Sequence, residues 1–553
     1  MENNGFDIRE AGVMPLINAL CESFDLTEII NQNLSWDEKQ CKLSPGDHIK
    51  ALVLNILNKR TALYQVENSF REYDLELLFG AGVTPEDFND DVLGRTLDKF
   101  YAANPKKVFS SFALQAIAKD NVDLSVIHGD TTSKVVYGQY QGEGQLNVTY
   151  GRNKDHRPGL KQYICGLLTT GDGGIPLFGE VKDGNFDDKT WNKELLPQLA
   201  ELMDIEDLKK MIYVADSALV NKSCLEKIQA QKLQFISRFP HNFNLADELI
   251  EEAWGKNEWK EVGRLAKKKT SAEYKYWETG RKIYGQEYRM IVVHSTHLDG
   301  RKLKGLNKRL EKRKVELEKA IKENEKKEYA CTPDAERDLK RFLKENKDRF
   351  YKLNGWVEKE RVKKRRNNRG RPRKGETPEY EERIILRIKL GDLNEAAVNE
   401  ERERLSCFIL ITNVDGKKRN GLEILKEYKR QHTVENKFKF IKNPVLIGPI
   451  YLQKKERLEA LTYVVLIALL IYSILERRVR QALKKEDKPI VLKGNVKSFE
   501  PTGNRIIELF EPVKILKIND SGSMKRVIPK RYLNLQRLLS FAGFDMSIYQ
   551  APG

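Results

Sequence analysis

The sequence predicts an α/β protein in which a core of strands and helices is preceded by an all-α domain and interrupted by a long insertion. Three observations support this class. Helical patterns fill residues 1–118, and strand-length apolar runs alternate with helices over 119–240. A charged, largely helical stretch over 241–400 then precedes a return to apolar strand and helix patterns. With 553 residues, the chain is also too long for one hydrophobic core.

Residues 1–118 form the predicted helical domain. Ser44, Pro45 and Asp47 mark a helix start, because they supply an N-cap, a proline at the first helical position and an acid at the positive helix end. Apolar residues then recur every three or four positions, as on one buried face: Ile49, Leu52, Val53, Ile56 and Leu57. A second amphipathic helix fits Asp91–Tyr101. Such a domain suits DNA binding, dimerisation or both.

The region 119–240, the first part of the core, has the element order of a ribonuclease-H-like fold. Three strands are followed by a helix, a strand, a helix and a strand: Val122–Ile127, Lys134–Tyr140, Gln162–Leu168, Trp191–Met203, Met211–Ala215, Lys222–Gln231 and Phe235–Ser237. In that topology the ends of the first and fourth strands meet. We therefore expect Asp130 and Asp216, which close those strands, to lie together.

Residues 241–400 are predicted to be an insertion that combines strands with a basic helical hairpin. Its outer parts alternate as strands do, at Glu273–Thr279, Tyr288–His294 and Arg383–Leu390. The centre carries an apolar helical seam formed by Leu303, Leu306, Leu310, Leu317 and Ala320. A second helix would supply the partner face of the hairpin, with Leu339, Phe342, Leu343 and Phe350.

The second part of the core is expected over 401–483. It begins with a strand at Cys407–Thr412 and continues with a helical stretch at Gly421–Ile441. Leu458–Leu475 is apolar enough to resemble a membrane span, but it contains Glu459 and is flanked by charge, so we interpret it as a buried core helix. Residues 484–553 form a predicted basic tail with turns and two short helical stretches.

The composition indicates a polyanionic partner. The formal net charge is +17 and the pI is about 9.2, which favours nucleic acid over the alternative of a merely solvated basic surface. The six cysteines are scattered without a C-x-x-C pair, which argues against a familiar zinc finger and against a disulfide framework. The N-terminus lacks the pattern of a signal peptide. We therefore expect an intracellular protein without a membrane partner.

Asp130, Asp216 and Glu435 are the candidate catalytic and metal-binding residues. Asp130 and Asp216 follow apolar strands, and Glu435 lies in the predicted helix Gly421–Ile441. Three carboxylates from two strand ends and a helix can hold two Mg²⁺ ions (Mn²⁺ can substitute) about 3.5–4 Å apart on one phosphate. Such ions stabilise both the attacking and the leaving oxygen of a phosphodiester displacement. His128, two residues before Asp130, is interpreted as a structural histidine.

Motifs around the two aspartates carry a family resemblance. They are Gly129–Ser133, Tyr150-Gly151, Asn153–Gln162, Gly174–Leu177 and Asp183–Lys189. These residues resemble the catalytic core of the DDE transposases of bacterial and archaeal insertion sequences. The specific group is the IS-four-like superfamily, in which an insertion separates the second Asp from the Glu. The separation of 219 residues between Asp216 and Glu435 agrees with this (435 − 216 = 219).

The resemblance also implies a Tyr-x2-Arg-x3-Glu-x6-Lys box around the glutamate. The spacing assigns Tyr428, Gln431, Glu435 and Lys442 to this box, with DNA-binding roles for all but Glu435. On a continuous helix these four positions lie within about 60° of one another. Lys442 would hold a DNA phosphate, with a solvated helix end as the alternative. The sequence departs from the box at Gln431, where the resemblance implies arginine, and Arg430 would lie on the wrong face to replace it.

A further DNA-binding candidate lies in the insertion. Arg369-Gly370-Arg371-Pro372-Arg373-Lys374 resembles the core of an AT-hook, which fits the narrow minor groove of A·T-rich DNA. The alternative is a flexible basic linker that contacts phosphates without sequence preference.

Together these features predict a transposase that cleaves DNA at the ends of an insertion sequence and transfers the strands to target DNA. The expected partners are double-stranded DNA and a second copy of the chain in a synaptic homodimer. The expected location is the cytoplasm of a prokaryote, at the nucleoid. A catalytically inactive DNA-binding relative and a metal-dependent nuclease without strand transfer are the alternatives. Glycoside hydrolysis by a carboxylate pair is a more distant one.

Overall fold

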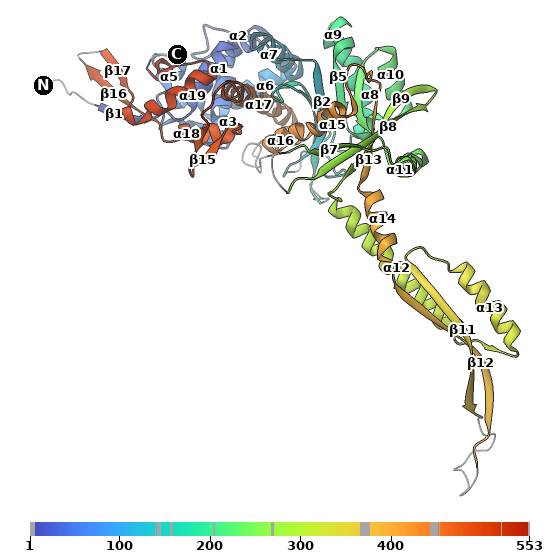
Figure 1. Cartoon of the computed structure of the whole chain (residues 1–553). Helices are drawn as coiled ribbons and strands as arrows, with labels where there is room; N and C mark the ends of the chain where they lie inside the picture. Colours follow the sequence, from blue (N-terminus) through green and yellow to red (C-terminus); the bar gives the residue numbers. More distant parts are fainter. Residues whose placement is uncertain are drawn as a thin grey trace. The chain divides into compact units, whose positions relative to one another are not determined.

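The computed structural model divides into two compact units (Figure 1). Unit 1 comprises Met1–Arg238, Lys282–Tyr288 and Ile411–Gly553, and unit 2 comprises Phe239–Arg281 and Arg289–Leu410. The structure describes residues 6–138, 140, 145–154, 157, 159–202, 205–266, 270–364, 377–442, 452, 454–520 and 523–550.

The N-terminal part of unit 1 is built mainly from helices. These are α1 (Met14–Ser23), α2 (Leu26–Asn33), α3 (Pro45–Leu57), α4 (Val66–Phe70), α5 (Leu75–Phe79), α6 (Asp90–Ala102) and α7 (Pro105–Lys119). Helix α3 begins where predicted: the Ser44 hydroxyl accepts from the backbone N–H of Asp47, whose carboxylate accepts from the N–H of Ser44. A Cβ at Gly46 would collide with the carbonyl oxygen of Thr27, so glycine allows α3 to pack closely on α2.

The N-terminal and C-terminal ends of unit 1 form one small sheet. Strand β1 (Phe6–Glu10) pairs with β16 (Lys514–Asp520), which also pairs with β17 (Ser523–Val527). The N-terminal region is therefore not all-α, because β1 needs a partner that lies more than 500 residues away in the chain. The region 484–553, predicted as a tail, is largely folded. It also contains β14 (Ile490–Leu492), β15 (Val496–Ser498), α18 (Gly503–Phe510) and α19 (Gln536–Ala542).

A large mixed sheet forms the core of unit 1. Its strands are β2 (Val126–Val135), β3 (Gln162–Thr170), β4 (Pro176–Lys182), β5 (Ile212–Ala215) and β6 (Gln234–Arg238), in the order β4-β3-β2-β5-β6. Strand β3 is antiparallel to both β2 and β4, whereas β2, β5 and β6 are parallel. The helices of this region are α8 (Asp188–Leu202), α9 (Ile205–Lys210) and α10 (Lys222–Ala230). The predicted contact between the first and fourth strands is confirmed, because β2 pairs directly with β5.

Two of the predicted strands are wrong in detail. The segment Lys134–Tyr140 is not a separate strand, because β2 runs without interruption through Val135. The third strand is instead β4, which begins at Pro176. Strand β4 is the last strand on its side of the sheet, and proline is tolerated at the first residue of such a strand.

Helix α17 (Lys455–Leu483) is the central helix of unit 1 (Figure 1). It packs against α3, α6, α7, α19 and β4. Its apolar window is long enough to cross a membrane, but 94% of that window is buried inside the protein, in agreement with the predicted core helix. Ahead of it lie the second-part elements β13 (Cys407–Thr412), α15 (Gly421–Lys429) and α16 (His432–Ile441).

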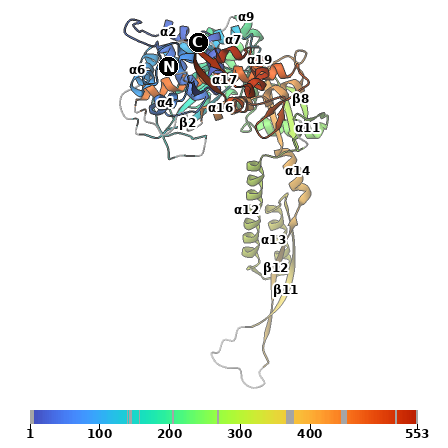
Figure 2. The ribbon, with the colours of Figure 1, turned by 90° about the vertical axis from the view of Figure 1, so that its left-hand side faces the viewer.

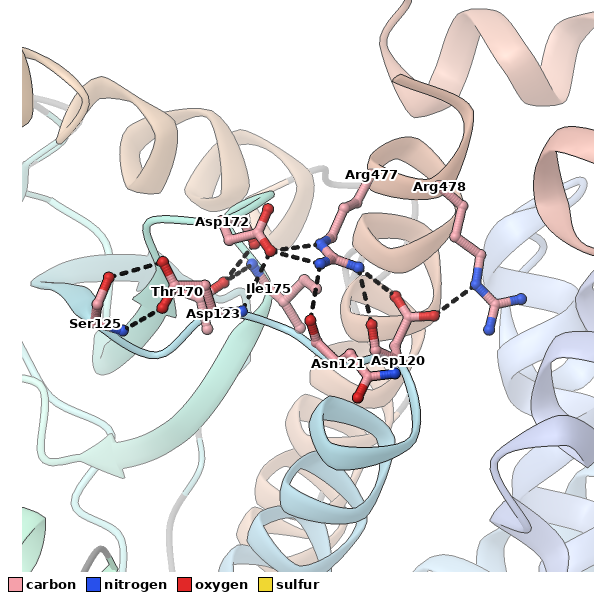
Figure 3. Close-up of polar contacts among 9 residues, drawn as sticks. All are labelled: Asp120, Asn121, Asp123, Ser125, Thr170, Asp172, Ile175, Arg477 and Arg478. Atoms are coloured by element: carbon pink, nitrogen blue, oxygen red, sulfur yellow. Dashed lines mark hydrogen bonds and ion pairs between the residues drawn. The ribbon is translucent and has the colours of Figure 1, made fainter. Parts of the chain in front are cut away.

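A buried ion-pair network joins α17 to the segment that leads into β2 (Figure 3). The guanidinium of Arg477 is 2.8 Å from the carboxylate of Asp120 and also contacts that of Asp172 at 2.5 Å. It also donates to the backbone carbonyls of Asp120 and Asn121 at 3.1 and 3.2 Å. Arg478 holds the other oxygen of Asp120 at 2.7 Å. The network therefore fixes the start of the strand that carries Asp130.

Unit 2 contains the inserted residues. Its elements are α11 (Asn244–Lys256), β7 (Lys260–Arg264), β8 (Glu273–Ile283), β9 (Gln286–Ser295), α12 (Gly300–Asn324), β10 (Glu328–Tyr329), α13 (Thr332–Glu345), β11 (Tyr351–Lys363), β12 (Tyr380–Leu393) and α14 (Glu395–Leu405). Strands β11 and β12 form a long antiparallel ribbon, and α12 and α13 both lie alongside it (Figure 2).

The helical hairpin predicted for the insertion is wrong. Helix α13 packs its Leu339 and Phe342 against Leu386 and Ile388 of β12, and Ile321 near the end of α12 is a buried member of the same cluster. The N-terminal half of α12 packs instead on α14, through Leu306, Leu310 and Val398. The sequence pattern concealed the ribbon because burial alternates only over Tyr351–Val357, and the rest of β11 is charged and mostly exposed.

Candidate active site

Asp130 and Asp216 lie level with each other on neighbouring parallel strands. The pairing of β2 with β5 joins Val126 to Ile212 and His128 to Val214, a constant offset of 86 residues. Asp130 and Asp216 have the same offset (216 − 130 = 86), so they continue this pairing. Asp216 directly follows the end of β5, whereas Asp130 lies in the middle of β2, so its predicted place at a strand end is wrong. Two side chains at one level of adjacent strands can reach the same ligand.

The two aspartates share an environment that disfavours their charges. Burial, with the neighbouring carboxylates of Asp216 and Asp188, raises the pKa of Asp130 to about 7, although Lys154 opposes this effect. Burial first, and then Asp188, also raise the pKa of Asp216. The backbone N–H groups of Thr131 and Ala218 donate to Asp130 and Asp216 at 2.7 and 3.0 Å. These N–H groups fix the orientation of both carboxylates.

Lys154 and Asp188 belong to the site, although no role was predicted for either. The ammonium of Lys154 lies 3.7 Å from the Asp130 carboxylate and 3.1 Å from that of Asp188. It also donates to the carbonyl and hydroxyl oxygens of Thr131 at 2.8 and 2.9 Å, and that hydroxyl donates to Asp188. Both residues lie in motifs on which the family resemblance rests. Their sequence position alone does not show that they contact Asp130.

Tyr428 links the glutamate of the predicted site to the two aspartates. Burial raises the pKa of Tyr428 to about 12, with Arg238 opposing and Asp216, Asp130 and Glu435 adding to the effect. The phenol is therefore within electrostatic range of all three predicted catalytic carboxylates. Glu435 itself is exposed, in the first turn of α16.

Arg238 lies on the same edge of the sheet. The pairing of β5 with β6 joins Ile212 to Gln234 and Ala215 to Ser237, an offset of 22 residues, which also separates Asp216 from Arg238 (238 − 216 = 22). Asp130, Asp216 and Arg238 therefore form one row across three parallel strands. Sequence analysis missed Arg238, because it ends a short strand and belongs to no motif.

The predicted continuous helix Gly421–Ile441 is wrong. Helix α15 ends at Lys429, and α16 begins at His432. Between them the N–H groups of Gln431 and Val434 donate to carbonyls three residues back, at Tyr428 and Gln431. This tighter turn invalidates the helical-wheel argument that placed Tyr428, Gln431, Glu435 and Lys442 on one face. Lys442 is the C-cap of α16, and Gln431 is half-buried at its N-cap.

A buried polar pair anchors α15 to the strand of Asp130. The Nε2 atom of His128 is 3.4 Å from the carboxylate of Glu427, and both side chains are at most 5% exposed. Glu427 also pairs with Arg419 and Arg430, each at 3.3 Å. Because Glu427 immediately precedes Tyr428, this pair sets the position of the phenol relative to β2. The interpretation of His128 as structural agrees with this contact.

The donor set fits a hard divalent cation, although the arrangement is incomplete. Carboxylate oxygens are the ligands that Mg²⁺ prefers, and the Lys154 ammonium already lies beside Asp130 and Asp188, so a positive charge is accommodated there. Within the described residues, no group of three His, Cys, Asp or Glu side chains is arranged to hold a metal ion. The described residues therefore align Asp130 with Asp216 but do not assemble a three-carboxylate metal site with Glu435.

The AT-hook-like residues Arg369, Arg371, Arg373 and Lys374 fall between β11 and β12, outside the residues that the structure describes. Their predicted contact with the minor groove stays a prediction.

Comparisons with known families match most of the chain. Residues 127–471, which include Asp130, Asp216 and Glu435, match the family described as "Transposase DDE domain". Residues 6–114 match the family described as "Domain of unknown function (DUF4277)". A comparison with curated proteins found no match.

Comparisons with solved structures give distant similarities only. A piggyBac transposase synaptic complex with hairpin DNA is 9% identical, with a TM-score of 0.37 over 91% of this chain and 80% of that one. A pre-cleavage Mos1 transpososome is 10% identical, with a TM-score of 0.16 over 40% of this chain and 68% of that one. These scores are too low to support an argument about the site.

Proposed function

The chain belongs to the transposase DDE domain family, and we therefore propose that it cleaves DNA at the ends of a mobile element and joins those ends to target DNA. The observation that carries this proposal is the register of Asp130 and Asp216, which aligns two half-buried carboxylates on neighbouring parallel strands. Two neighbouring carboxylates repel each other when both are charged, and a cation bound between them would offset this repulsion.

Asp130, Asp216 and Glu435 would hold the metal ions of the reaction. Two Mg²⁺ ions, or Mn²⁺ in their place, would stabilise the attacking and leaving oxygens of the phosphodiester. The chain's own contribution is to hold the carboxylates in position. The N–H groups of Thr131 and Ala218 orient Asp130 and Asp216, and Glu435 would be supplied from the first turn of α16.

Lys154 would exchange partners when a metal ion binds. In the structure its ammonium neutralises Asp130 and Asp188. A divalent cation at Asp130 would remove the need for this pairing and leave the ammonium available for a DNA phosphate. Asp188 would retain the lysine near the site, because it also accepts from the Thr131 hydroxyl.

Arg238, Tyr428 and Gln431 would contact the DNA next to the carboxylates. Arg238 is level with Asp216, and its charge acts on the Tyr428 phenol. A guanidinium at this position can form a bidentate hydrogen bond with a phosphate. Arg238 would then provide the positive side chain for which the family resemblance implies an arginine at position 431, where this chain has Gln431. Lys442 and the AT-hook-like segment would contact DNA farther from the reacting phosphate.

The finer assignments rest on the sequence motifs. The Gly129–Ser133 and Asp183–Lys189 segments and the spacing of Tyr428, Glu435 and Lys442 support a bacterial or archaeal insertion-sequence enzyme of the IS-four-like superfamily. Such an enzyme would act as a homodimer that brings two element ends together, at the nucleoid in the cytoplasm.

A cleavage assay tests the proposal. Wild-type protein is incubated with Mg²⁺ and a labelled duplex that carries the ends of the encoding element, while a second duplex captures joined products. The test variant is Glu435→Gln. The matched control is Glu395→Gln, because Glu395 is also an exposed acid in the first turn of a helix, α14. We expect cleavage and joining by wild type and the control, and a loss of at least about a hundredfold in Glu435→Gln.

Other results would identify the alternatives. Cleavage without any joined product indicates a metal-dependent nuclease. Tight binding without cleavage, in Mg²⁺ and in Mn²⁺, indicates an inactive DNA-binding relative, an alternative to which Gln431 already points.

A further inference from the structure

Helix α12 of unit 2 has an uneven distribution of charge along its length. Residues 300–314 contain eight Lys or Arg residues and one acid, Glu311, whereas residues 315–324 contain two Lys and three Glu residues. The N-terminal half therefore carries a net charge of +7, and the C-terminal half a net charge of −1. No acidic residue lies in its first turn.

This distribution opposes the intrinsic preference of a helix. The N-terminus of a helix carries a partial positive charge, so cations in the first turns are unfavourable by about 0.3–1 kcal/mol each. Arg301, Lys302 and Lys304 lie in these turns. Lys302 has a structural role, because it donates to the carbonyls of Leu405 and Cys407 at 2.7 and 3.3 Å. The packing of unit 2 does not explain Lys304 in the same way, because its side chain is exposed.

Four basic residues of α12 form a stripe on its solvent-facing side. At 100° per residue, Arg301, Lys304, Lys308 and Lys312 lie within about 80° of one another. All four are exposed. The buried residues Leu306, Leu310, Leu317 and Ile321 are centred on the opposite side of the helix. The basic stripe therefore runs about 16 Å along the helix, directly away from the packed face.

The middle of the stripe is not neutralised by the protein itself. Among the described residues, Lys304 and Lys308 have no ion pair, and Lys312 has only a distant one with Glu316 at 3.8 Å. Two arginines of α12 outside the stripe are used internally, since Arg309 pairs with Glu401 and Arg313 with Asp348. Within the part of unit 2 that the structure describes, the ammonium groups of Lys304 and Lys308 are therefore not neutralised by an acidic side chain.

Gly305 borders the stripe, about 20° beyond Lys312 around the helix, and has no packing reason to be glycine. A Cβ at this position would meet nothing within 4 Å among the described residues. Glycine inside an exposed helix costs about 1 kcal/mol relative to alanine. A missing side chain between Lys304 and Lys308 leaves the helix backbone open to close approach by a ligand.

We propose that the basic stripe of α12 (Arg301, Lys304, Lys308 and Lys312) binds the phosphate backbone of duplex DNA, with Gly305 as the point of closest approach. DNA fits because its phosphates follow one another about every 3.4 Å of axis along each strand, so a stripe of about 16 Å can meet several of them. The contact would be independent of sequence, since the stripe offers only ammonium and guanidinium groups at fixed intervals. This inference rests on the proposed action of the chain on DNA.

Two triple variants of the full-length protein test the stripe. The first is Lys304→Gln/Lys308→Gln/Lys312→Gln. The second is the control, Lys340→Gln/Lys344→Gln/Lys347→Gln, which removes the same charge from exposed positions in and just after α13 of the same unit. Binding to a fluorescein-labelled duplex of arbitrary sequence is followed by anisotropy over a series of salt concentrations, without divalent metal.

The stripe variant should bind about tenfold more weakly than wild type, and the slope of log affinity against log salt should fall by about 2–3, near 0.9 for each phosphate that the protein no longer binds. The control should retain the wild-type slope to within about 1. The melting temperature of the stripe variant should stay close to that of wild type, because all three lysines are exposed and, among the described residues, the only ion pair is that of Lys312 with Glu316 at 3.8 Å. Weaker binding by a protein of unchanged stability cannot come from misfolding.

Equal slopes for the stripe variant and wild type would overturn the inference. Equal DNA binding combined with a changed molecular mass in light scattering would also overturn it, and would assign the stripe to a protein contact. Metal-dependent cleavage by wild type is measured separately. If wild type fails to cleave, the proposed function is wrong, whereas the binding slopes still decide the role of the stripe.

Discussion

Replacing Arg477 with methionine should loosen the attachment of β2 to α17. The Arg477 side chain is only 7% exposed, and it joins Asp120, Asp172 and two backbone carbonyls (Figure 3). Methionine fills similar space but leaves the carbonyls of Asp120 and Asn121 without this donor. Breaking a buried ion pair from one side costs about 3–5 kcal/mol. Asp120 keeps Arg478 at 2.7 Å, so we expect the lower end, about 3 kcal/mol.

Hydrogen exchange followed by mass spectrometry measures this effect locally. In the regime where exchange follows the opening equilibrium, a loss of about 3 kcal/mol speeds exchange roughly a hundredfold. The increase should appear in peptides from β2 and α17. Arg337→Met is the surface control, because Arg337 is 80% exposed and its ion pair among the described residues is with Asp334 at 3.4 Å. This variant should change exchange in α13 by less than about threefold.

A double-mutant cycle with Asp172→Asn identifies the interaction responsible. Asp172 contacts Arg477, and its second partner is the backbone N–H of Asp123 at 3.3 Å. After Arg477→Met, the further replacement of Asp172 should therefore cost less than it does alone, with a coupling of at least about 1 kcal/mol. Additive effects, or an unchanged exchange rate in β2, would refute the reasoning that this network fixes the strand.

Three further outcomes are expected. First, since burial raises the pKa of Asp130 to about 7, the native chain holds a proton there between about pH 4 and 7 that the unfolded chain has released, so this group makes stability fall as pH rises through that window. The free energy of unfolding of Asp130→Asn minus that of wild type, measured in urea with EDTA, should therefore be larger at pH 8 than at pH 5. The same value at both pH values would contradict this. Second, Arg238→Ala should lower the cleavage rate at least about tenfold while changing the affinity for long duplexes less than about threefold. Adding Gln431→Arg to this variant should restore part of the cleavage rate. An unchanged cleavage rate, or a loss of DNA affinity alone, would show that Arg238 does not belong to the site. Third, Lys154→Met should raise the apparent affinity for Mn²⁺, measured by calorimetry without DNA, because the metal no longer competes with an ammonium; a weaker affinity would show that Lys154 does not occupy the place of the cation.

The sequence predicted the parts of the fold that depend on local patterns. The start of α3 followed from Ser44 and Asp47, and the buried α17 from its apolar length and flanking charge. The meeting of β2 and β5 followed from the order of the elements, which limits the possible sheet topologies. These features require no knowledge of distant contacts beyond the fold class.

The failures share a physical cause, because each depends on a partner far away in the chain. Strand β1 forms on β16, and the charged β11 is a strand only because β12 pairs with it along its length. The break between α15 and α16 has no proline or glycine to mark it; it coincides with the ion pairs that hold Glu427 and Arg430. Lys154, Asp188 and Arg238 were missed for the same reason. Their places in the site come from strand register and loop contacts, which a linear pattern does not reveal.

The chain leaves unit 1 after Arg238 and, apart from the short segment Lys282–Tyr288, returns to it at Ile411. Inside unit 1 these two points are neighbours, since the Thr412 hydroxyl donates to the carbonyl of Phe235 and the N–H of Phe235 donates to the Asn413 side chain. Asp216 lies 22 residues before the departure, and Glu435 lies 24 residues after the return (238 − 216 = 22; 435 − 411 = 24). Each doubling of the length between two fixed ends costs only about 0.6 kcal/mol. Because the two ends of the insertion are held together inside unit 1, the length of the segment between them has little effect on the cost of holding those ends in place, and a longer or shorter insertion at this point would be tolerated.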